Sequence, residues 1–411
     1  MKKTLLLSVV ASTMIMAGGD IAPVEPVIEA PVVEASGWDF SGQAVAYYQT
    51  VDAVDRLATG DAGLFAETSS AANVGLQLRA MNADIFYGFG AGVEVSALGT
   101  MWLESGELDI VSGIMQNSDG SALGKGGWIS QAYLTYGFGN TAIKVGRQEL
   151  PKALSPFAFS ESWNVFKNTF EAALIVNTDI SDTTLVGAWV TAANNHGDMG
   201  NFADLNGDDG VFMLTAQNKS VENLTVTGSL YYAPEFDVYA EDALIYWIDA
   251  KYNAGLFTVA GQGGYIDANA VRGDNDTVAY GAKVAANYDM FNLSAAYSYV
   301  NENSFGIRNL GTGVKTPLYT QMVANQGVIS NDASYVKLAA GASALGGNFG
   351  LAYGMRMDSD LLGDNNPYEV DVTYSTKVFN DSTSILAAYV YADDDAGTDA
   401  SIIRLWGRYN F

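Results

Sequence analysis

Cysteine is absent from this chain of 411 residues, and histidine occurs only once. The absence of cysteine excludes a disulfide framework and a thiolate metal centre. His196 lies in a polar segment with no serine nucleophile motif to accompany it, so a Ser–His hydrolase is disfavoured. A glycine-rich phosphate loop is also missing. We therefore predict that the protein is not an enzyme.

Long apolar runs and basic residues are scarce as well. A membrane-crossing helix needs about 20 apolar residues in succession. The sequence has no such run, so a part that crosses a membrane has to be a closed β-barrel. Lys and Arg number 20 against 46 Asp and Glu, which gives a net charge of −26. This balance argues against nucleic acid as a partner.

The first residues have the features of a secretory signal. Met1 is followed by two lysines, and residues 5–17 are almost wholly apolar. We predict a signal peptide over residues 1–17. Residues 18–36 contain Pro23, Pro26 and Pro31, and we expect them to form an extended periplasmic lead-in. Residues 37–411 then form the body of the protein.

The last ten residues, 402–411, alternate in character. One set of alternate positions is mostly apolar or aromatic, and the other carries two arginines. In a β-strand the two sets face opposite sides. A strand of this kind suits a wall between lipid and water, with the terminal Phe411 in an aromatic girdle at the headgroups.

The same alternation recurs along the chain. Clear examples are residues 38–49, 72–80, 128–138, 224–232, 278–288, 349–357 and 368–375. The pattern predicts about 18 strands, with 16 as the alternative count. Short connections such as 139–141 alternate with long ones such as 100–127, 194–210 and 301–332. The predicted fold is an all-β, transmembrane, antiparallel β-barrel with short periplasmic turns and long outer loops.

Proline and charge test this assignment against a secreted β-sandwich or solenoid. Proline cannot donate to a sheet ladder, and a closed barrel has no edge to hold it. Beyond the lead-in, every proline falls in an expected loop: Pro151, Pro156, Pro234, Pro317 and Pro367. We also place no charged residue on an outward strand position, where it would meet lipid. Both observations favour the barrel.

The charged residues of the strands are expected on the inner face, where they line a water-filled lumen. The predicted pore-lining residues are Arg79, Glu94, Lys144, Glu171, Lys251, Lys283, Lys337, Arg356, Glu369, Asp371, Arg404 and Arg408, with Asp39 and Asp249 beside them. Such side chains set up a field that filters solutes by charge. Simple solvation of a wet wall is the alternative explanation.

The loop after the fifth strand, residues 147–167, contains two prolines and four bulky aromatic residues. We predict that it folds into the barrel and narrows the pore, because its aromatic residues need an apolar surface. The predicted constriction residues are Arg147, Glu149, Lys152, Glu161 and Lys167. An outer loop packed on its neighbours is the alternative.

Acidic loop residues suggest two kinds of cation contact. Asp204, Asn206 and Asp208 present alternate oxygen ligands, as in half of a calcium loop. Solvated loop acids are the alternative, because the glycine spacing differs and no bidentate Glu follows. Residues 393–395 are three consecutive aspartates, which can bridge through divalent cations to lipopolysaccharide phosphates.

Three short segments carry a resemblance to a known family. Residues 70–76, 128–134 and above all 146–151, which reads Gly-Arg-Gln-Glu-Leu-Pro, are similar to segments of the Opr-family porins. That family includes the major outer membrane porins of campylobacter-like bacteria. The resemblance implies an 18-stranded barrel whose third loop narrows the pore. It also implies a homotrimer and, in some members, bound calcium.

The sequence thus predicts a porin of the bacterial outer membrane. It would be a passive diffusion channel for ions and small hydrophilic solutes, filtered by the third loop and by the lumen charges. Its expected surroundings are lipopolysaccharide and outer-membrane lipid. The alternative is a surface structural or adhesion protein with a plugged barrel.

Overall fold

The structure is a computed structural model, and it describes residues 37–53, 63–66, 69–100, 126–163, 165–195, 199–236, 242–268, 276–301, 306–324, 332–357, 365–379, 381–395 and 399–411. The predicted signal peptide and lead-in, and His196, lie outside the described residues. Among the described residues, no helix is long and apolar enough to cross a membrane.

In the described residues, nineteen strands form one antiparallel sheet. The first nine are β1 (Asp39–Ala53), β2 (Ser70–Phe86), β3 (Phe89–Gly99), β4 (Gly126–Phe138), β5 (Thr141–Gln148), β6 (Phe170–Asn177), β7 (Thr183–Asn194), β8 (Phe202–Asp204) and β9 (Val211–Asn218). The others are β10 (Leu224–Ala233), β11 (Ala243–Ala254), β12 (Phe257–Ala268), β13 (Thr277–Tyr288), β14 (Phe291–Val300), β15 (Ala333–Ala344), β16 (Gly347–Met357), β17 (Tyr368–Val378), β18 (Thr383–Asp393) and β19 (Asp399–Asn410).

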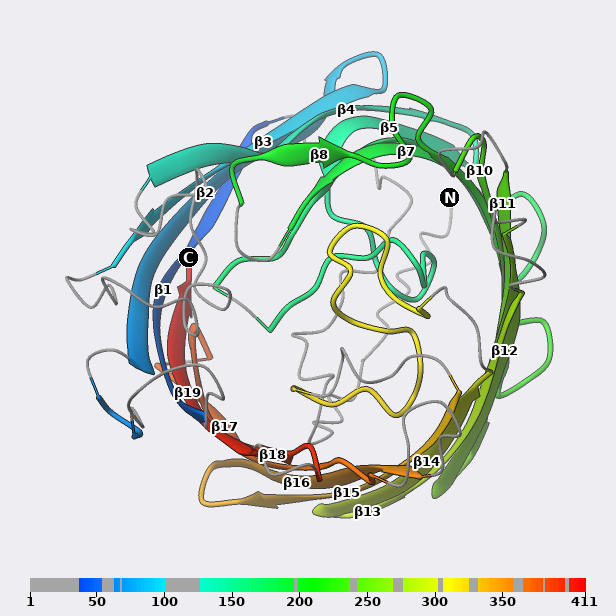
Figure 1. Cartoon of the computed structure of the whole chain (residues 1–411). Coiled ribbons are helices and arrows are strands. Elements are labelled where there is room, and N and C mark those ends of the chain that lie inside the picture. Colours follow the sequence, from blue (N-terminus) through cyan, green and yellow to red (C-terminus); the bar gives the residue numbers. More distant parts are fainter. Residues whose placement is uncertain are drawn as a thin grey trace.

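The sheet closes on itself, because β1 pairs with β19 on one side and with β2 on the other. Figure 1 shows the resulting ring of strands. The strand β8 has only three residues and extends the outer end of β7, which otherwise pairs with β9. Eighteen strands therefore make the wall, as the sequence predicted. Closure pairs every edge, which is the condition for a β-structure in lipid.

Alternating side chains give the wall two different faces. On β2, Val74, Leu76 and Leu78 are exposed on the outside, while Asn73 and Gln77 between them are buried inside. Large exposed apolar residues recur in this way on the other strands. A soluble protein would bury so extensive an apolar surface. The outer face is therefore built for contact with lipid.

The first and last strands of the barrel meet in the sheet. Phe411 and Gly42 exchange backbone hydrogen bonds, with N–O distances of 2.8 and 3.0 Å. A Cβ atom on Gly42 would lie 2.7 Å from the Phe411 ring, so only glycine leaves room for it. The Phe411 ring lies 5.8 Å from Tyr409 and is half exposed on the outer surface, as expected for a residue of the aromatic girdle.

Two of the outer connections enter the ring instead of leaving it. We call them L3 (residues 149–169, between β5 and β6) and L7 (residues 301–332, between β14 and β15). Figure 1 shows L3 in teal and the described part of L7 in yellow within the barrel. The sequence predicted the inward fold of L3, and that prediction is confirmed. It gave no indication that L7 enters as well.

Candidate functional site in the barrel interior

L3 is folded by its own turns and held by its aromatic residues. The amide groups of Leu154 and Ser155 donate to the Pro151 carbonyl, and Ser160 N donates to the Leu150 carbonyl at 2.9 Å. These bonds satisfy a backbone that would otherwise be buried without partners. The loop therefore keeps a fixed shape inside the barrel.

The aromatic side chains of L3 reach strands on several sides of the wall. Phe157 packs edge-on against Tyr231 of β10 and Trp247 of β11, with ring centroids 5.7 and 5.2 Å away. Trp163 lies 5.4 Å from Trp406 of β19. Because these strands lie far apart around the ring, L3 extends across the interior (Figure 1). This is the burial of aromatic residues that the sequence predicted.

Arginines of β19 hold the same loop through its backbone. Arg404 donates from Nη1 to the Trp163 carbonyl and from Nε to Gln49 Oε1, both at 2.8 Å. Arg408 donates from Nη2 to the Val165 carbonyl at 3.1 Å. Guanidinium groups offer several donors in a fixed plane, which suits this kind of anchoring. Both arginines face inward, as predicted, but their guanidinium groups bind the backbone of L3.

L7 is anchored in a comparable way. Lys337 of β15 donates from Nζ to the Gln321 carbonyl at 2.7 Å, and Glu369 of β17 accepts from Ala324 N at 2.7 Å. Arg356 of β16 donates to the Asn365 carbonyl of a different outer loop at 2.6 Å. Asp371 is fully buried beside Glu369. These four predicted pore-lining residues face inward but are covered by loops.

A first group of charges remains in the interior between β2, β5 and L3. Arg79 forms an ion pair with Glu94 at 2.5 Å and lies 3.9 Å from Glu149, which pairs with Lys167 at 2.9 Å. Lys144 lies 3.7 Å above the ring of Tyr133. We call Arg79, Glu94, Lys144, Glu149 and Lys167 the first charged group.

Neighbouring cations favour the ionised form of Glu149 in this group. Burial disfavours the charged form of Glu149, but the ammonium of Lys167 and the cations Arg79 and Lys144 outweigh burial and lower its pKa. A bulge in β4 lets Ser130 face inward, where its Oγ donates to Glu94 Oε1 at 2.7 Å. Ser130 was not predicted, because a bulge breaks the regular alternation.

A second group lies on β11 and β13, across the ring from the first. Its centre is Asp249, which accepts a hydrogen bond from the Tyr319 hydroxyl of L7. Lys251, Lys283 and Lys152 of L3 lie near enough to act on Asp249 electrostatically. We call Asp249, Lys152, Lys251 and Lys283 the second charged group. Tyr319 was not predicted, because its position depends on the inward fold of L7.

Three predicted positions are wrong. Arg147 and Glu171 pair directly across β5 and β6, on the same face as the exposed Val145 and Ile175, so both face outward. Their side chains form an ion pair at 2.6 Å beside L3. The prediction that no charge faces outward therefore fails at this rim, where the pair neutralises itself.

Glu161 is the third error. It does not face the channel, because it is buried with only 2 % of its surface exposed. Lys152 is also partly buried, and its Nζ donates to the Thr316 carbonyl at 3.2 Å. Of the five predicted constriction residues, Glu149 and Lys167 lie in the first charged group and Lys152 in the second.

The loop proposed for calcium is held by its own hydrogen bonds. The Asn206 amide donates to the carbonyls of Gly210 and Pro234. Asp204 lies in β8, and Asp208 is exposed on the following turn. Within the described part of the chain, no group of three or more acidic or histidine side chains is placed to hold a metal. Calcium binding at this loop stays a prediction.

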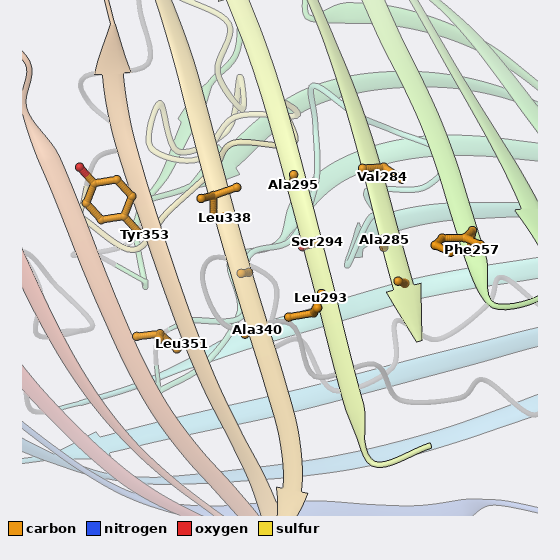
Figure 2. A pocket seen from close by; sticks show the side chains of 12 residues that line it. Phe257, Val284, Ala285, Leu293, Ser294, Ala295, Leu338, Ala340, Leu351 and Tyr353 are labelled. Carbon is orange, nitrogen blue, oxygen red and sulfur yellow. The ribbon is translucent and has the colours of Figure 1, made fainter. Parts of the chain in front are cut away.

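A cavity of about 490 Å³ lies on the outer face of the barrel and does not belong to the interior. Figure 2 shows side chains that line it from neighbouring strands, among them Leu293, Leu338 and Tyr353. Its surface is almost wholly apolar, with small residues such as Ala295 and Ala340 between larger ones. A groove of this kind fits hydrocarbon and offers no means of recognising a hydrophilic solute.

The fold and interior define a large closed β-barrel with two of its own loops folded inside. No protein-family model matches the chain, and no curated protein matches its sequence. Among solved structures, Acinetobacter baumannii OccAB3 is similar with a TM-score of 0.74 and 14% identity, over 92% of this chain and 100% of that one.

Two Pseudomonas aeruginosa structures are also similar. OccK8 (OprE) has a TM-score of 0.72 at 14% identity, over 91% of this chain and 98% of that one. OpdK, solved with vanillate, has a TM-score of 0.71 at 13% identity, again over 91% and 98%. These neighbours are outer-membrane porins. At such low identity the likeness concerns the fold, and the narrower resemblance to campylobacter porins stays a prediction.

Proposed function

We propose that the protein is a porin of the Gram-negative outer membrane, a passive diffusion channel for ions and small hydrophilic solutes. The observation that carries the proposal is the contrast between the two faces of one closed wall. The outside is apolar, whereas the inside holds two charged groups with side chains that still reach water. The side chain of Arg79, for example, is 36% exposed.

The filter in this proposal is the space between the two charged groups and the inward loops. The first group has three basic and two acidic members, and the second has three basic and one acidic member. Opposed charges in a narrow, water-filled passage produce a field that favours some solutes over others. The fold supports this reading, because similar barrels are porins.

The competing function is a structural or adhesion protein with a plugged barrel. L3 and L7 occupy part of the interior, which is the observation in its favour. Conductance of the purified protein in planar lipid bilayers separates the two. A porin gives stepwise, ohmic current, and its reversal potential in a salt gradient reports the selectivity of the channel. A correctly folded barrel that stays electrically silent would end the porin proposal.

The expected surroundings belong to the same proposal. Lipopolysaccharide would contact the acidic outer loops through divalent cations. In residues 393–395, the Asp393 side chain accepts from Asp395 N at 2.7 Å, so these acids form an ordered turn. A homotrimer is proposed from the family resemblance alone. Mass measurement of the detergent-solubilised protein, with and without lipopolysaccharide and calcium, tests these assignments.

A further inference from the structure

One buried carboxylate, that of Glu161 on L3, connects the two inward loops. Its Oε1 atom accepts hydrogen bonds from Asn309 Nδ2 at 2.7 Å and from Lys315 N at 3.2 Å, and also from the Thr312 hydroxyl. All three donors belong to L7. Glu161 is 2% exposed, so its charge is used within the protein and is not offered to solutes.

The chemistry of this contact is demanding. A carboxylate away from water is stable only when donors replace its hydration. Hydrogen bonds to an ionised acceptor are also about twice as strong as those between neutral groups. Because the donors span residues 309–315, L7 has to curl around the carboxylate to provide them. Glu161 therefore fixes the shape of L7 as well as its position.

Other contacts at this joint are neutral or peripheral. Asn309 bonds Phe159 twice, through Phe159 N to Oδ1 at 3.2 Å and through Nδ2 to the Phe159 carbonyl at 2.7 Å. Leu310 N donates to the Phe157 carbonyl at 2.7 Å. Lys152 reaches the Thr316 carbonyl at the edge. The Glu161 carboxylate, in contrast, is charged and bonds to three separate residues of the L7 turn.

The joint lies far from the strands that carry L7. Gly311, next to the donors, packs on Phe170 of β6 and Ala193 of β7, on the opposite side of the ring from β14 and β15 (Figure 1). We call residues 309–315 the tip of L7. The tip lies far from β14 and β15, the strands that L7 connects. Specific contacts have to hold it there, because an unattached loop of this length has a high conformational entropy. L3 supplies the attachment through Glu161.

We propose that Glu161 is a positioning residue that locks the tip of L7 onto L3, so that the two loops act as a single constriction. The inference deepens the proposed function and rests on it. Loss of the carboxylate leaves the Thr312 hydroxyl and Lys315 amide without their acceptor, and water then competes for them. The tip of L7 leaves the opposite wall, and the open cross-section of the lumen grows.

Single-channel recording of Glu161→Ala in planar bilayers tests the proposal. We expect the conductance to rise by at least about 1.5-fold, with added open-channel noise, because conduction follows the size of the constriction. Glu161→Ala combined with Thr312→Val should give no further rise, since the Thr312 hydroxyl bonds to L3 through the Glu161 carboxylate. Glu222→Ala, in an exposed turn between β9 and β10, is the matched control and should conduct like the wild type.

Thr312→Val is a second, milder variant in case the alanine variant folds poorly. It removes one donor and keeps the charge, so a smaller rise is expected. Folding is checked by the heat-dependent gel mobility of the barrel. Unchanged conductance in folded Glu161→Ala and Thr312→Val proteins overturns the proposal.

A readout independent of current separates this inference from the porin function. The chain has no native cysteine, so Leu318→Cys, at a buried position of L7, gives a single thiol. A small water-soluble maleimide labels this thiol. The labelling rate should rise about tenfold or more when Glu161→Ala is added, because the detached loop exposes residue 318 to water. A silent wild-type channel would refute the porin function, and equal labelling rates would refute the joint.

Discussion

The basic side chains on the inner face fall into two kinds. Arg404, Arg408 and Lys337 donate to backbone carbonyls of L3 or L7 and are largely covered. Lys251 stays open to the lumen, and Lys283 lies inward beside Asp249. The first kind supports the loops, and the second can act on a solute. Substitutions should therefore affect stability in one case and selectivity in the other.

Arg404 belongs to the first kind, so its loss should loosen L3. Arg404→Ala removes the hydrogen bonds to the Trp163 carbonyl and to Gln49. We expect the free energy of unfolding to fall by about 1–3 kcal/mol. The temperature at which the barrel changes its gel mobility should fall. Lys251→Ala is the control, since that lysine is exposed to the lumen. Equal transition temperatures for the two variants would contradict the anchoring role.

The charge of Glu149 determines how the first charged group responds to acid. Lys167 and the neighbouring cations lower its pKa below the usual value of 4.5. A lowered carboxyl pKa contributes stability that is present above the usual value and is lost as the pH falls through the lowered one.

We therefore expect Glu149 to stay ionised from about pH 7 to pH 5, so that it causes little change in the reversal potential over this range. In stronger acid Glu149 loses its negative charge, and the reversal potential should then shift in the direction of greater anion selectivity. Glu149→Gln should show the acid-type selectivity already at neutral pH. Measurement across the pH series in both proteins checks this. A variant that matches the wild type at every pH would contradict the assignment.

At the level of elements, the inward fold of L3 can be predicted from its sequence more readily than that of L7. L3 carries Phe157, Trp163 and Phe166 after its two prolines, and such residues need an apolar surface. L7 also buries apolar residues, including Leu318 and Met322, but they are scattered in a long polar connection. Sequence reasoning identified the first loop for this reason and missed the second.

The packing of L7 on the far wall gives a prediction for that element. A Cβ atom on Gly311 would lie 2.5 Å from the Phe170 ring. Gly311→Val should therefore displace the tip of L7 from this wall and lower the free energy of unfolding by about 1–3 kcal/mol. Conductance should rise as in Glu161→Ala. Gly407→Val is the control, because open space surrounds that position. A rise with Gly407→Val, or none with Gly311→Val, would oppose this account.

The whole molecule combines a strongly acidic chain with an interior in which basic residues predominate in both charged groups. The net charge of −26 describes the chain, and a solute in the lumen experiences mainly the groups nearest to it. Net charge therefore gives no measure of selectivity. The distribution of charge over the barrel decides it.

Lys251→Glu tests that distribution. Reversing one charge of the second group should shift the cation-to-anion permeability ratio toward cations by about twofold or more. Lys219→Glu changes the net charge equally but lies in an exposed turn outside the lumen, so it should leave the ratio unchanged. Reversal potentials in a salt gradient measure both. Equal shifts in the two variants would mean that net charge, not position, governs selectivity.

The sequence by itself determined the wall. Because side chains alternate every second residue, strand number, facing and the exclusion of proline follow from local pattern. The inward direction of Arg404 and Lys283 was predictable for the same reason. The prediction was wrong at Arg147 and Glu171, because the two residues alternate in step with the exposed Val145 and Ile175 and so lie on the outer face.

Only the tertiary structure decided which inward charges meet water. Arg356 and Lys283 both occupy inward positions of their strands. Arg356 nevertheless donates to a carbonyl of an outer loop, whereas Lys283 lies beside Asp249. The outcome depends on L3 and L7, whose contacts join residues about 150 positions apart, such as Glu161 and Asn309. Local periodicity holds no information about such pairs, because they form only when the closed ring confines both loops to one space.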